Sequence, residues 1–259
     1  MDAINHAAAR SKVPGPTLGF WIIKILATTL GETGGDALSM SLDLGYLVST
    51  AIFAVIFAAL VVLQIRARRF NAYLYWLTII ATTTLGTTVA DFCDRSLGIG
   101  YLGGSLILLA LLLASLALWR HVEGTVDVNT VATPRSEAFY WVTILFSQTL
   151  GTALGDWTAD TNGLGYGGGA IVFLAALAVV AGFYFLTSVS RVGLFWSAFV
   201  LTRPLGATVG DLIDKPAALG GFAFGRFHAS LLLLVAVFAL IVVTRPKAGA
   251  HPGVRDARV

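Results

Sequence analysis

The chain has 259 residues, of which 57% are hydrophobic and 12% are charged, and its formal net charge is +3. Soluble domains carry about 25% charged residues, so this composition excludes an ordinary soluble domain and indicates an integral membrane protein. The single cysteine, Cys93, excludes an internal disulfide and a metal centre built from several thiolates, so any metal would have oxygen or histidine ligands.

Eight apolar segments follow one another along the chain, and each is long enough, at about 20 residues, to cross a hydrocarbon core of roughly 30 Å. The sequence therefore predicts an all-α polytopic membrane protein, in which residues 1–259 form one membrane domain with eight transmembrane helices. The apolar run of the first segment opens with Phe20 and Trp21 and lacks a small-residue cleavage site, so we expect it to remain as the first span. The segments are 17–40, 45–65, 72–94, 99–119, 138–160, 165–187, 192–214 and 220–244.

One pattern, Trp-x7-Thr-Leu-Gly-x3-[Gly/Ala]-Asp, occurs four times, with Pro204 replacing the threonine in the last copy. Each repeat contains two apolar segments, so all four enter the membrane in the same direction and form parallel repeats around an axis along the membrane normal. The copies of the pattern run from Trp21 to Asp36, Trp76 to Asp91, Trp141 to Asp156 and Trp196 to Asp211. The repeats cover approximately residues 17–66, 72–120, 137–187 and 192–244, with a polar linker at 121–136.

Basic residues predict the orientation, because connections rich in lysine and arginine remain in the cytoplasm. They gather at the termini and between repeats, whereas the connections within repeats are mixed to acidic. We therefore expect a multi-pass protein of the bacterial inner membrane, with both termini in the cytoplasm, the lipid bilayer as its partner and no nucleic-acid partner. The basic residues on the cytoplasmic side are Arg10, Lys12, Arg66, Arg68, Arg69, Arg120, Arg135, Arg191, Arg245, Lys247, Arg255 and Arg258.

Aromatic residues near both ends of the segments are typical of belts at membrane–water interfaces, which anchor and pack the helices. Those at the cytoplasmic end are Trp21, Tyr75, Trp76, Tyr140, Trp141 and Trp196, and those at the outer end are Tyr46, Tyr101, Tyr166 and Phe222.

Small residues four positions apart recur in every copy of the pattern, and such pairs let helix backbones approach closely in lipid. The sequence therefore predicts that the first helices of the four repeats touch one another near their outer ends. The pairs are Gly31 with Gly35, Gly86 with Ala90, Gly151 with Gly155 and Gly206 with Gly210.

The aspartate that ends each pattern is the main candidate for a function, because a carboxylate inside a membrane is costly and is usually retained for a purpose. About 22 Å of helix separates it from the tryptophan, which places it in the outer half of the bilayer. Four aspartates with Glu32 nearby must be protonated, hydrated or matched by a cation, and carboxylate oxygens suit protons, Mg, Ca or Mn. The candidate cation or metal ligands are Asp36, Asp91, Asp156 and Asp211, with Glu32 added for cation binding.

Several polar residues accompany this set. Thr29, Glu32 and Asp36 share one helix face, and Thr84 and Thr149 take the place of Thr29 in the next two copies, so we expect these threonines to support the site. The acids nearer the connections, in contrast, are expected to be solvated or to form turns. These are Asp43, Asp94, Asp160 and Asp214.

Two cations break the repeat pattern. Lys24 stands where the other copies have an apolar residue, and Arg203 stands where they have Thr28, Thr83 or Gln148. Because intramembrane cations normally pair with acids, we expect both to face the bundle interior and to neutralise carboxylates or gate the site. Snorkelling of Lys24 to the inner interface is the alternative.

The chain is not expected to be an enzyme. It has no nucleophile elbow, no His-Glu-x-x-His motif and no phosphate loop. Intramembrane aspartyl proteases require glycine three residues before an aspartate, and Thr33, Thr88, Ala153 and Thr208 occupy those positions. No cofactor motif is present, so a divalent cation is the expected ligand.

The tryptophan, Thr-Leu-Gly, Gly/Ala-Asp and Leu-Gly-Tyr elements resemble those of bacterial membrane proteins built from four copies of the repeat called domain of unknown function 347. The resemblance covers about residues 17–244 and implies two spans per repeat, but it implies no activity; Pro204 and Gly221 depart from it. The stretch from Glu32 to Asp36 also resembles the Glu-x-Gly-Asp signature of a cation–proton exchanger family that handles manganese or calcium, offset by one residue and in one copy only.

These observations favour a transporter or exporter of a divalent cation that uses the carboxylates of the first helices. A membrane scaffold or sensor, whose aspartates form structural hydrogen bonds and which transports nothing, is the alternative. A small polar substrate remains open, as do the direction of transport and the oligomeric state.

Overall fold

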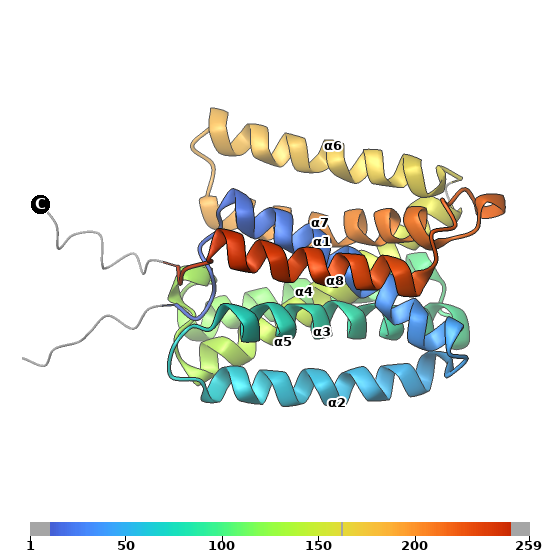
Figure 1. Ribbon diagram of the computed structural model, residues 1–259. Helices are drawn as coiled ribbons and strands as arrows, with labels where there is room; N and C mark the ends of the chain where they lie inside the picture. Colours follow the sequence, from blue (N-terminus) through green and yellow to red (C-terminus); the bar gives the residue numbers. More distant parts are fainter. Residues whose placement is uncertain (1–10, 162, 250–259) are drawn as a thin grey trace, which may run out of the picture.

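The computed structural model describes residues 11–161 and 163–249, so Arg10, Arg255, Arg258 and both chain ends lie outside the described residues. Within these ranges the protein is all-helical, with eight α-helices and no strand (Figure 1). The helices are α1 (Leu18–Asp36), α2 (Gly45–Arg66), α3 (Ala72–Asp91), α4 (Tyr101–Glu123), α5 (Pro134–Asp156), α6 (Gly165–Leu186), α7 (Arg191–Asp214) and α8 (Arg226–Thr244).

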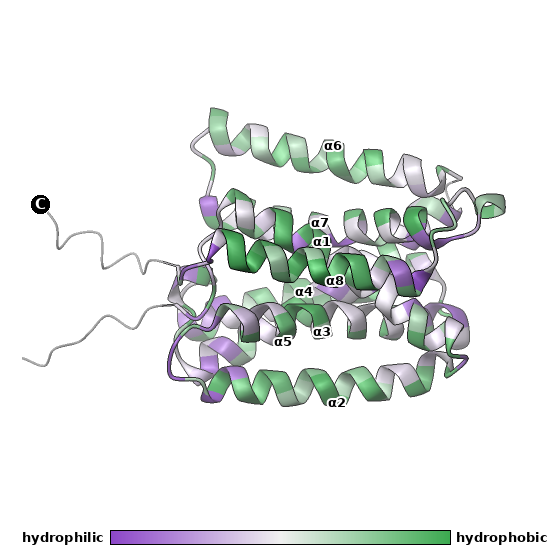
Figure 2. Ribbon diagram, viewed as in Figure 1, coloured by the Kyte–Doolittle hydropathy of each residue, from purple (hydrophilic) through white to green (hydrophobic). Residues whose placement is uncertain are grey.

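Five of the helices are long and apolar enough to cross a membrane, as expected for a membrane protein: α2, α4, α6, α7 and α8. Figure 2 shows apolar residues along the outer helices, whereas polar residues gather toward the two ends of the bundle. Wide π-helical turns continue α1, α3 and α5 directly beyond their aspartates. These turns are η1 (Ala37–Ser41), η2 (Phe92–Ser96) and η4 (Trp157–Thr161).

The odd-numbered helices form an inner ring in which α1, α3, α5 and α7 each contact two neighbours. Every even-numbered helix lies outside this ring and packs on the odd helix of the next repeat, so that α2 packs on α3, α4 on α5 and α6 on α7. The last helix, α8, closes the ring by packing on α1, where the hydroxyls of Ser230 and Thr33 are 2.8 Å apart. The repeats are therefore interlocked around one axis, with α2 and α6 at opposite edges in Figure 1.

The inner ring is tight because a glycine of each repeat faces a side chain of the next. A Cβ atom at Gly31 would overlap the side chain of Thr83, and one at Gly151 would overlap Arg203. Gly86 faces the backbone and Cβ of Gln148, and Gly206 faces Thr28. The small residues of the pattern thus set the separation of the inner helices.

Two boundaries differ from the sequence prediction. The linker is shorter than 121–136, because α4 continues to Glu123 and ends at the left-handed Gly124 (φ 76°), while Thr133 caps α5 and Pro134 begins it. The last helix starts at Arg226 and not near residue 220, because a 3-10 turn, Ala217–Leu219, and a loop come first.

The aromatic residues at the end where the repeats connect do not form a lipid-facing belt. Tyr75, Trp76 and Tyr140 have 0% exposure, and Trp141 and Trp196 have 2% and 6%, so the interfacial interpretation is wrong for them. They pack on one another and form an aromatic core across the end of the bundle, which we call the tryptophan end. The chain's described ends meet here too, since the N–H of Gly249 donates to the carbonyl of Val13 at 2.8 Å.

Candidate functional site

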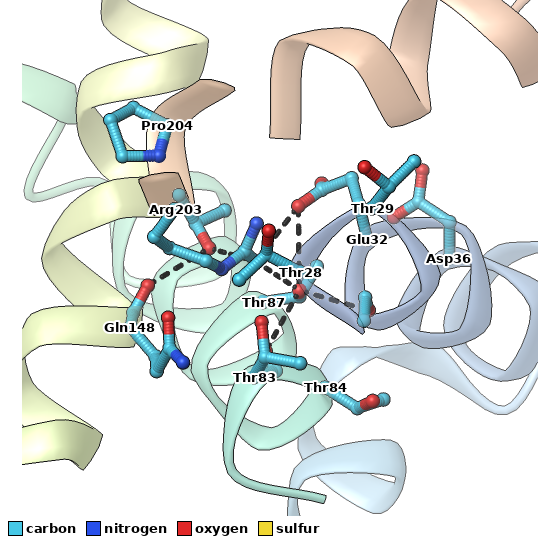
Figure 3. A network of polar contacts seen from close by, with 12 residues as sticks. Thr28, Thr29, Glu32, Asp36, Thr83, Thr84, Thr87, Gln148, Arg203 and Pro204 are labelled. Atoms are coloured by element: carbon cyan, nitrogen blue, oxygen red, sulfur yellow. Dashed lines mark hydrogen bonds and ion pairs between the residues drawn. The ribbon is translucent and has the colours of Figure 1, made fainter. Parts of the chain in front are cut away.

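Arg203 lies at the centre of the inner ring and connects all four repeats (Figure 3). It is completely buried, and its Nη2 donates to Glu32 at 2.9 Å, Thr87 at 2.6 Å and Thr152 at 2.5 Å. These three residues occupy the same position, 11 residues after the tryptophan, in repeats 1, 2 and 3. Repeat 4 has Ala207 at this position.

The four pattern aspartates lie toward the opposite end of the bundle, with exposures of 1% to 3%. They form two pairs, and each pair shares one cation from a connection within a repeat. Arg95 lies 2.9 Å from Asp91 and 3.5 Å from Asp156. Lys215 lies 2.6 Å from Asp36 and 3.1 Å from Asp211. Each cation thus joins the aspartate of its own repeat to that of the next.

Glu32, Asp36 and Asp211 are brought closest together, since each offers a carboxylate oxygen within 4.8 Å of the other two. The Lys215 ammonium contacts two of these three acids. Burial lowers the pKa of Lys215, but the carboxylates of Asp211 and Asp36 raise it more, so its pKa lies above the ordinary value and the side chain stays charged. This cluster, which we call the 4/1 cluster, joins repeat 4 to repeat 1.

Asp91 and Asp156 belong to the other half of the ring, where Arg95 joins them. The candidate ligands are therefore not gathered around one point: three of the acids lie in the 4/1 cluster and two lie beside Arg95.

The connection acids differ from one another. Asp43 and Asp160 are exposed, as expected for turn residues. Asp94 and Asp214 are each only 7% exposed, so the expectation that they are solvated is wrong. Asp214 is held by Arg226 at 3.0 Å, and Arg226 also lies 3.6 Å from Asp36.

Lys24 is also completely buried, so it does not snorkel to the end of the bundle. Its Nζ donates to the Thr202 hydroxyl at 3.2 Å and lies 3.9 Å from the centre of the Phe199 ring. Among the described residues it has no acidic partner. The equivalent residues Ile79, Ile144 and Phe199 are fully buried as well, so a layer that is apolar apart from Lys24 lies between Arg203 and the tryptophan end.

The supporting threonines bond to their own helices. The hydroxyls of Thr29, Thr84 and Thr149 donate to the carbonyls of Ile25, Ile80 and Leu145, four residues earlier in each case. Their positions are buried, but their hydrogen bonds satisfy the helix backbone and do not reach the carboxylates.

The sequence analysis did not single out Arg95 and Lys215, which stand in the connections within repeats, or Arg226 at the start of α8. The sequence did indicate a role for Arg95 and Lys215, because both stand four residues after the pattern aspartate, a spacing at which ion pairs along a helix form readily. Thr87 and Thr152 were missed because only the packed ring brings them to Arg203.

Comparisons with known proteins define the family. No curated protein and no solved structure matches the chain. The family described as Repeat of Unknown Function (DUF347) matches four consecutive segments, residues 19–70, 74–125, 139–190 and 194–246. These segments follow the four structural repeats, each with one inner and one outer helix, and together they cover most of the chain. The protein therefore belongs to this family and carries four tandem copies of its repeat.

Proposed function

We propose that all eight helices cross a cytoplasmic membrane, with the tryptophan end and both termini in the cytoplasm. The five apolar helices support this placement, and α1, α3 and α5 have 19, 20 and 23 residues, enough for roughly 28 to 35 Å of helix. These three are less apolar because they lie inside the ring, where they face one another and not lipid. Basic residues such as Arg66, Arg120 and Arg191 cluster at the tryptophan end, which favours a cytoplasmic position for it.

Within that frame we propose that the protein binds and transports a divalent cation through its buried carboxylates. The observation that carries this proposal is a charge imbalance in the ion-pair network at the ring. Among the residues that the structure describes, six acids take part, Glu32, Asp36, Asp91, Asp156, Asp211 and Asp214, and four bases, Arg95, Arg203, Lys215 and Arg226. Six minus four leaves two uncompensated negative charges, one on the 4/1 side, which has four acids and three bases, and one beside Arg95, which has two acids and one base. In a buried setting each half favours uptake of one proton, and the 4/1 side would balance a divalent cation once the charge of Lys215 is displaced.

The 4/1 cluster is the proposed binding point. Its three carboxylates are the hard oxygen donors that Mg, Ca and Mn prefer. The Lys215 ammonium already holds a cationic position against Asp36 and Asp211, so displacement of this tethered charge would open the cluster to an ion. Arg203 and the mostly apolar layer on its cytoplasmic side separate the cluster from the cytoplasmic end. Transport by alternating access requires such a barrier on one side of the binding site in a resting state.

A second function, a membrane scaffold or sensor that transports nothing, has an observation of its own. Each pattern aspartate contacts a basic side chain of the same chain, and these contacts link repeat 4 to repeat 1 and repeat 2 to repeat 3. Aspartates with this role hold repeats together and need no ion. The two functions predict different responses to cations.

The deciding experiment is thermal unfolding of purified protein in detergent with Mg, Ca, Mn or Zn, for the wild type and for Asp36→Asn. A ligand specific for the folded state adds about 2.7 kcal/mol at a hundredfold excess over its Kd. We expect one cation to raise the unfolding temperature of the wild type and to lose this effect in Asp36→Asn, and we expect the same variant to lose cation flux in proteoliposomes.

Two variants sharpen the result. Asp43→Asn removes an exposed carboxylate near the same end of the bundle and should respond as the wild type does. Lys215→Gln removes the tethered cation and should increase the stabilisation by the added ion. If no cation stabilises the wild type, and Asp36→Asn is unstable under all conditions, the scaffold function replaces the transporter.

A further inference from the structure

A groove of about 700 Å³ lies between α1, α6 and α7 toward the tryptophan end. Its walls are mostly apolar and include Trp21, Leu177, Ala181 and Phe195. Figure 1 shows α6 at the edge of the bundle, and α6 packs on α7 without a comparable contact to α1. The volume falls within the range of roughly 300 to 1,000 Å³ that is typical of sites for small molecules.

The groove coincides with a difference between repeat 3 and repeats 1 and 2. At 40 residues after the tryptophan, repeats 1 and 2 carry Val61 and Leu116, which pack against the core, whereas repeat 3 carries Ala181. Three residues later, Gln64 and Trp119 are 2% and 1% exposed. Their counterpart Tyr184 is 50% exposed. The outer helix of repeat 3 therefore lacks the side chains that pack against the core in repeats 1 and 2, and repeat 4 likewise has an alanine, Ala236, at the first of these positions.

Two of the described lining residues are charged: Arg191 at the start of α7 and Asp127 in the connection between α4 and α5. The Arg191 guanidinium lies 4.4 Å from the centre of the Tyr184 ring and donates to the Thr187 carbonyl at 3.3 Å. Asp127 lies in the same lining, and its Oδ1 accepts from the backbone N–H of Asn129 at 2.9 Å. The groove thus combines a long apolar floor with one cation and one anion at its cytoplasmic end.

The inner end of the groove reaches the polar centre of the bundle. Thr202 belongs to its lining and accepts the hydrogen bond of the buried Lys24 ammonium. A molecule in the groove would therefore pack against the residue that holds Lys24.

We propose that the groove binds one phospholipid with a zwitterionic, primary-amine headgroup. An acyl chain lies along Leu177 and Ala181, where apolar burial stabilises it. The phosphate faces Arg191, whose planar guanidinium suits phosphate oxygens, and the ammonium faces Asp127. The inference rests on the membrane placement proposed above and is independent of cation binding.

The test is native mass spectrometry of the full chain after mild delipidation, with phosphatidylethanolamine, phosphatidylglycerol or phosphatidylcholine added back. We expect one retained phosphatidylethanolamine per wild-type chain and weaker retention of the other two lipids. Ala181→Leu introduces the residue that repeat 2 has at this position and should lower the affinity about tenfold by filling the groove. Arg191→Gln should weaken all three lipids, and Asp127→Asn should abolish the preference for the primary amine.

The matched control is Ala59→Leu, which adds the same side chain at an exposed site on α2 and should retain lipid as the wild type does. Equal retention by Ala181→Leu and the wild type would show annular lipid only and overturn the proposal. So would wild-type retention of all three lipids by Arg191→Gln together with an unchanged headgroup preference in Asp127→Asn, because both substitutions lie outside the core. The cation response of the same delipidated protein reports on the proposed transport function separately.

Discussion

Arg203 shows how one residue can bind four repeats together. The two hydrogens of its Nη2 are shared among three acceptors, one from each of the other repeats. Only one acceptor, Glu32, carries a negative charge. Because both members of this ion pair are almost fully removed from solvent, each depends on the other to offset the cost of burying its charge.

We therefore predict that Arg203→Met destabilises the protein by about 3–5 kcal/mol, because Glu32 is left buried without a cation. Glu32→Gln should destabilise it for the converse reason. The double variant should be more stable than the sum of the two single effects indicates, since neither charge then remains alone. Unfolding in one detergent, with all four proteins in a double-mutant cycle, measures this coupling, and additive effects would contradict it.

At the level of the helices, the glycines of the inner ring differ in how much space surrounds them. A Cβ at Gly86 would lie 2.9 Å from the Thr149 nitrogen and 3.0 Å from the Gln148 carbonyl carbon, and backbone atoms cannot move aside as a side chain can. At Gly34 in α1 the nearest atom, the Ser230 hydroxyl oxygen, would be 4.0 Å away. The two glycines thus form a matched pair for testing the close contact of α3 with α5.

We predict that Gly86→Ala lowers stability by about 1–3 kcal/mol through overpacking. Gly34→Ala should be neutral or stabilising by up to about 1 kcal/mol, because alanine favours a helix more than glycine does. Thermal unfolding of both variants beside the wild type gives the answer. Equal effects of the two substitutions would mean that α3 and α5 do not approach as closely as the structure shows.

The sequence predicted the helical repeats and the face of small residues on each inner helix, because hydrophobic runs and small residues recur at a fixed spacing within one segment. It did not predict which outer helix packs on which inner helix, since outer helices are apolar on all sides and carry no directional signal. The partners of the aspartates were missed for a related reason. Lys215 and Arg95 are separated in sequence from the distant acids Asp36 and Asp156, and only closure of the ring brings these pairs together.

Across the whole molecule, the backbone fold repeats four times, whereas the arrangement of the cations that bridge the aspartates repeats only twice. Among the described residues, cations that bridge two pattern aspartates stand only in repeats 2 and 4, at Arg95 and Lys215, and repeats 1 and 3 have Met40 and Asp160 at the equivalent positions. Glu32 and Arg203 then make the two halves unequal. The 4/1 cluster therefore differs from its counterpart around Arg95, which explains why one half of the ring is the better candidate for an ion.

This assignment requires that repeat 4 return to repeat 1 within a single chain, and a cross-link can test the closure. Thr33 on α1 and Ser230 on α8 have hydroxyl oxygens 2.8 Å apart, so cysteines at both positions should form a disulfide under mild oxidation. In a Cys93→Ser background, we predict that Thr33→Cys with Ser230→Cys gives an intramolecular cross-link, detected by electrophoretic mobility and by mass spectrometry after digestion. Thr33→Cys with Ser105→Cys is the control, because Ser105 lies on α4, which packs on α5. Cross-linked dimers without the intramolecular product would show that α8 completes the ring of a second chain, and the 4/1 cluster would then be shared between two subunits.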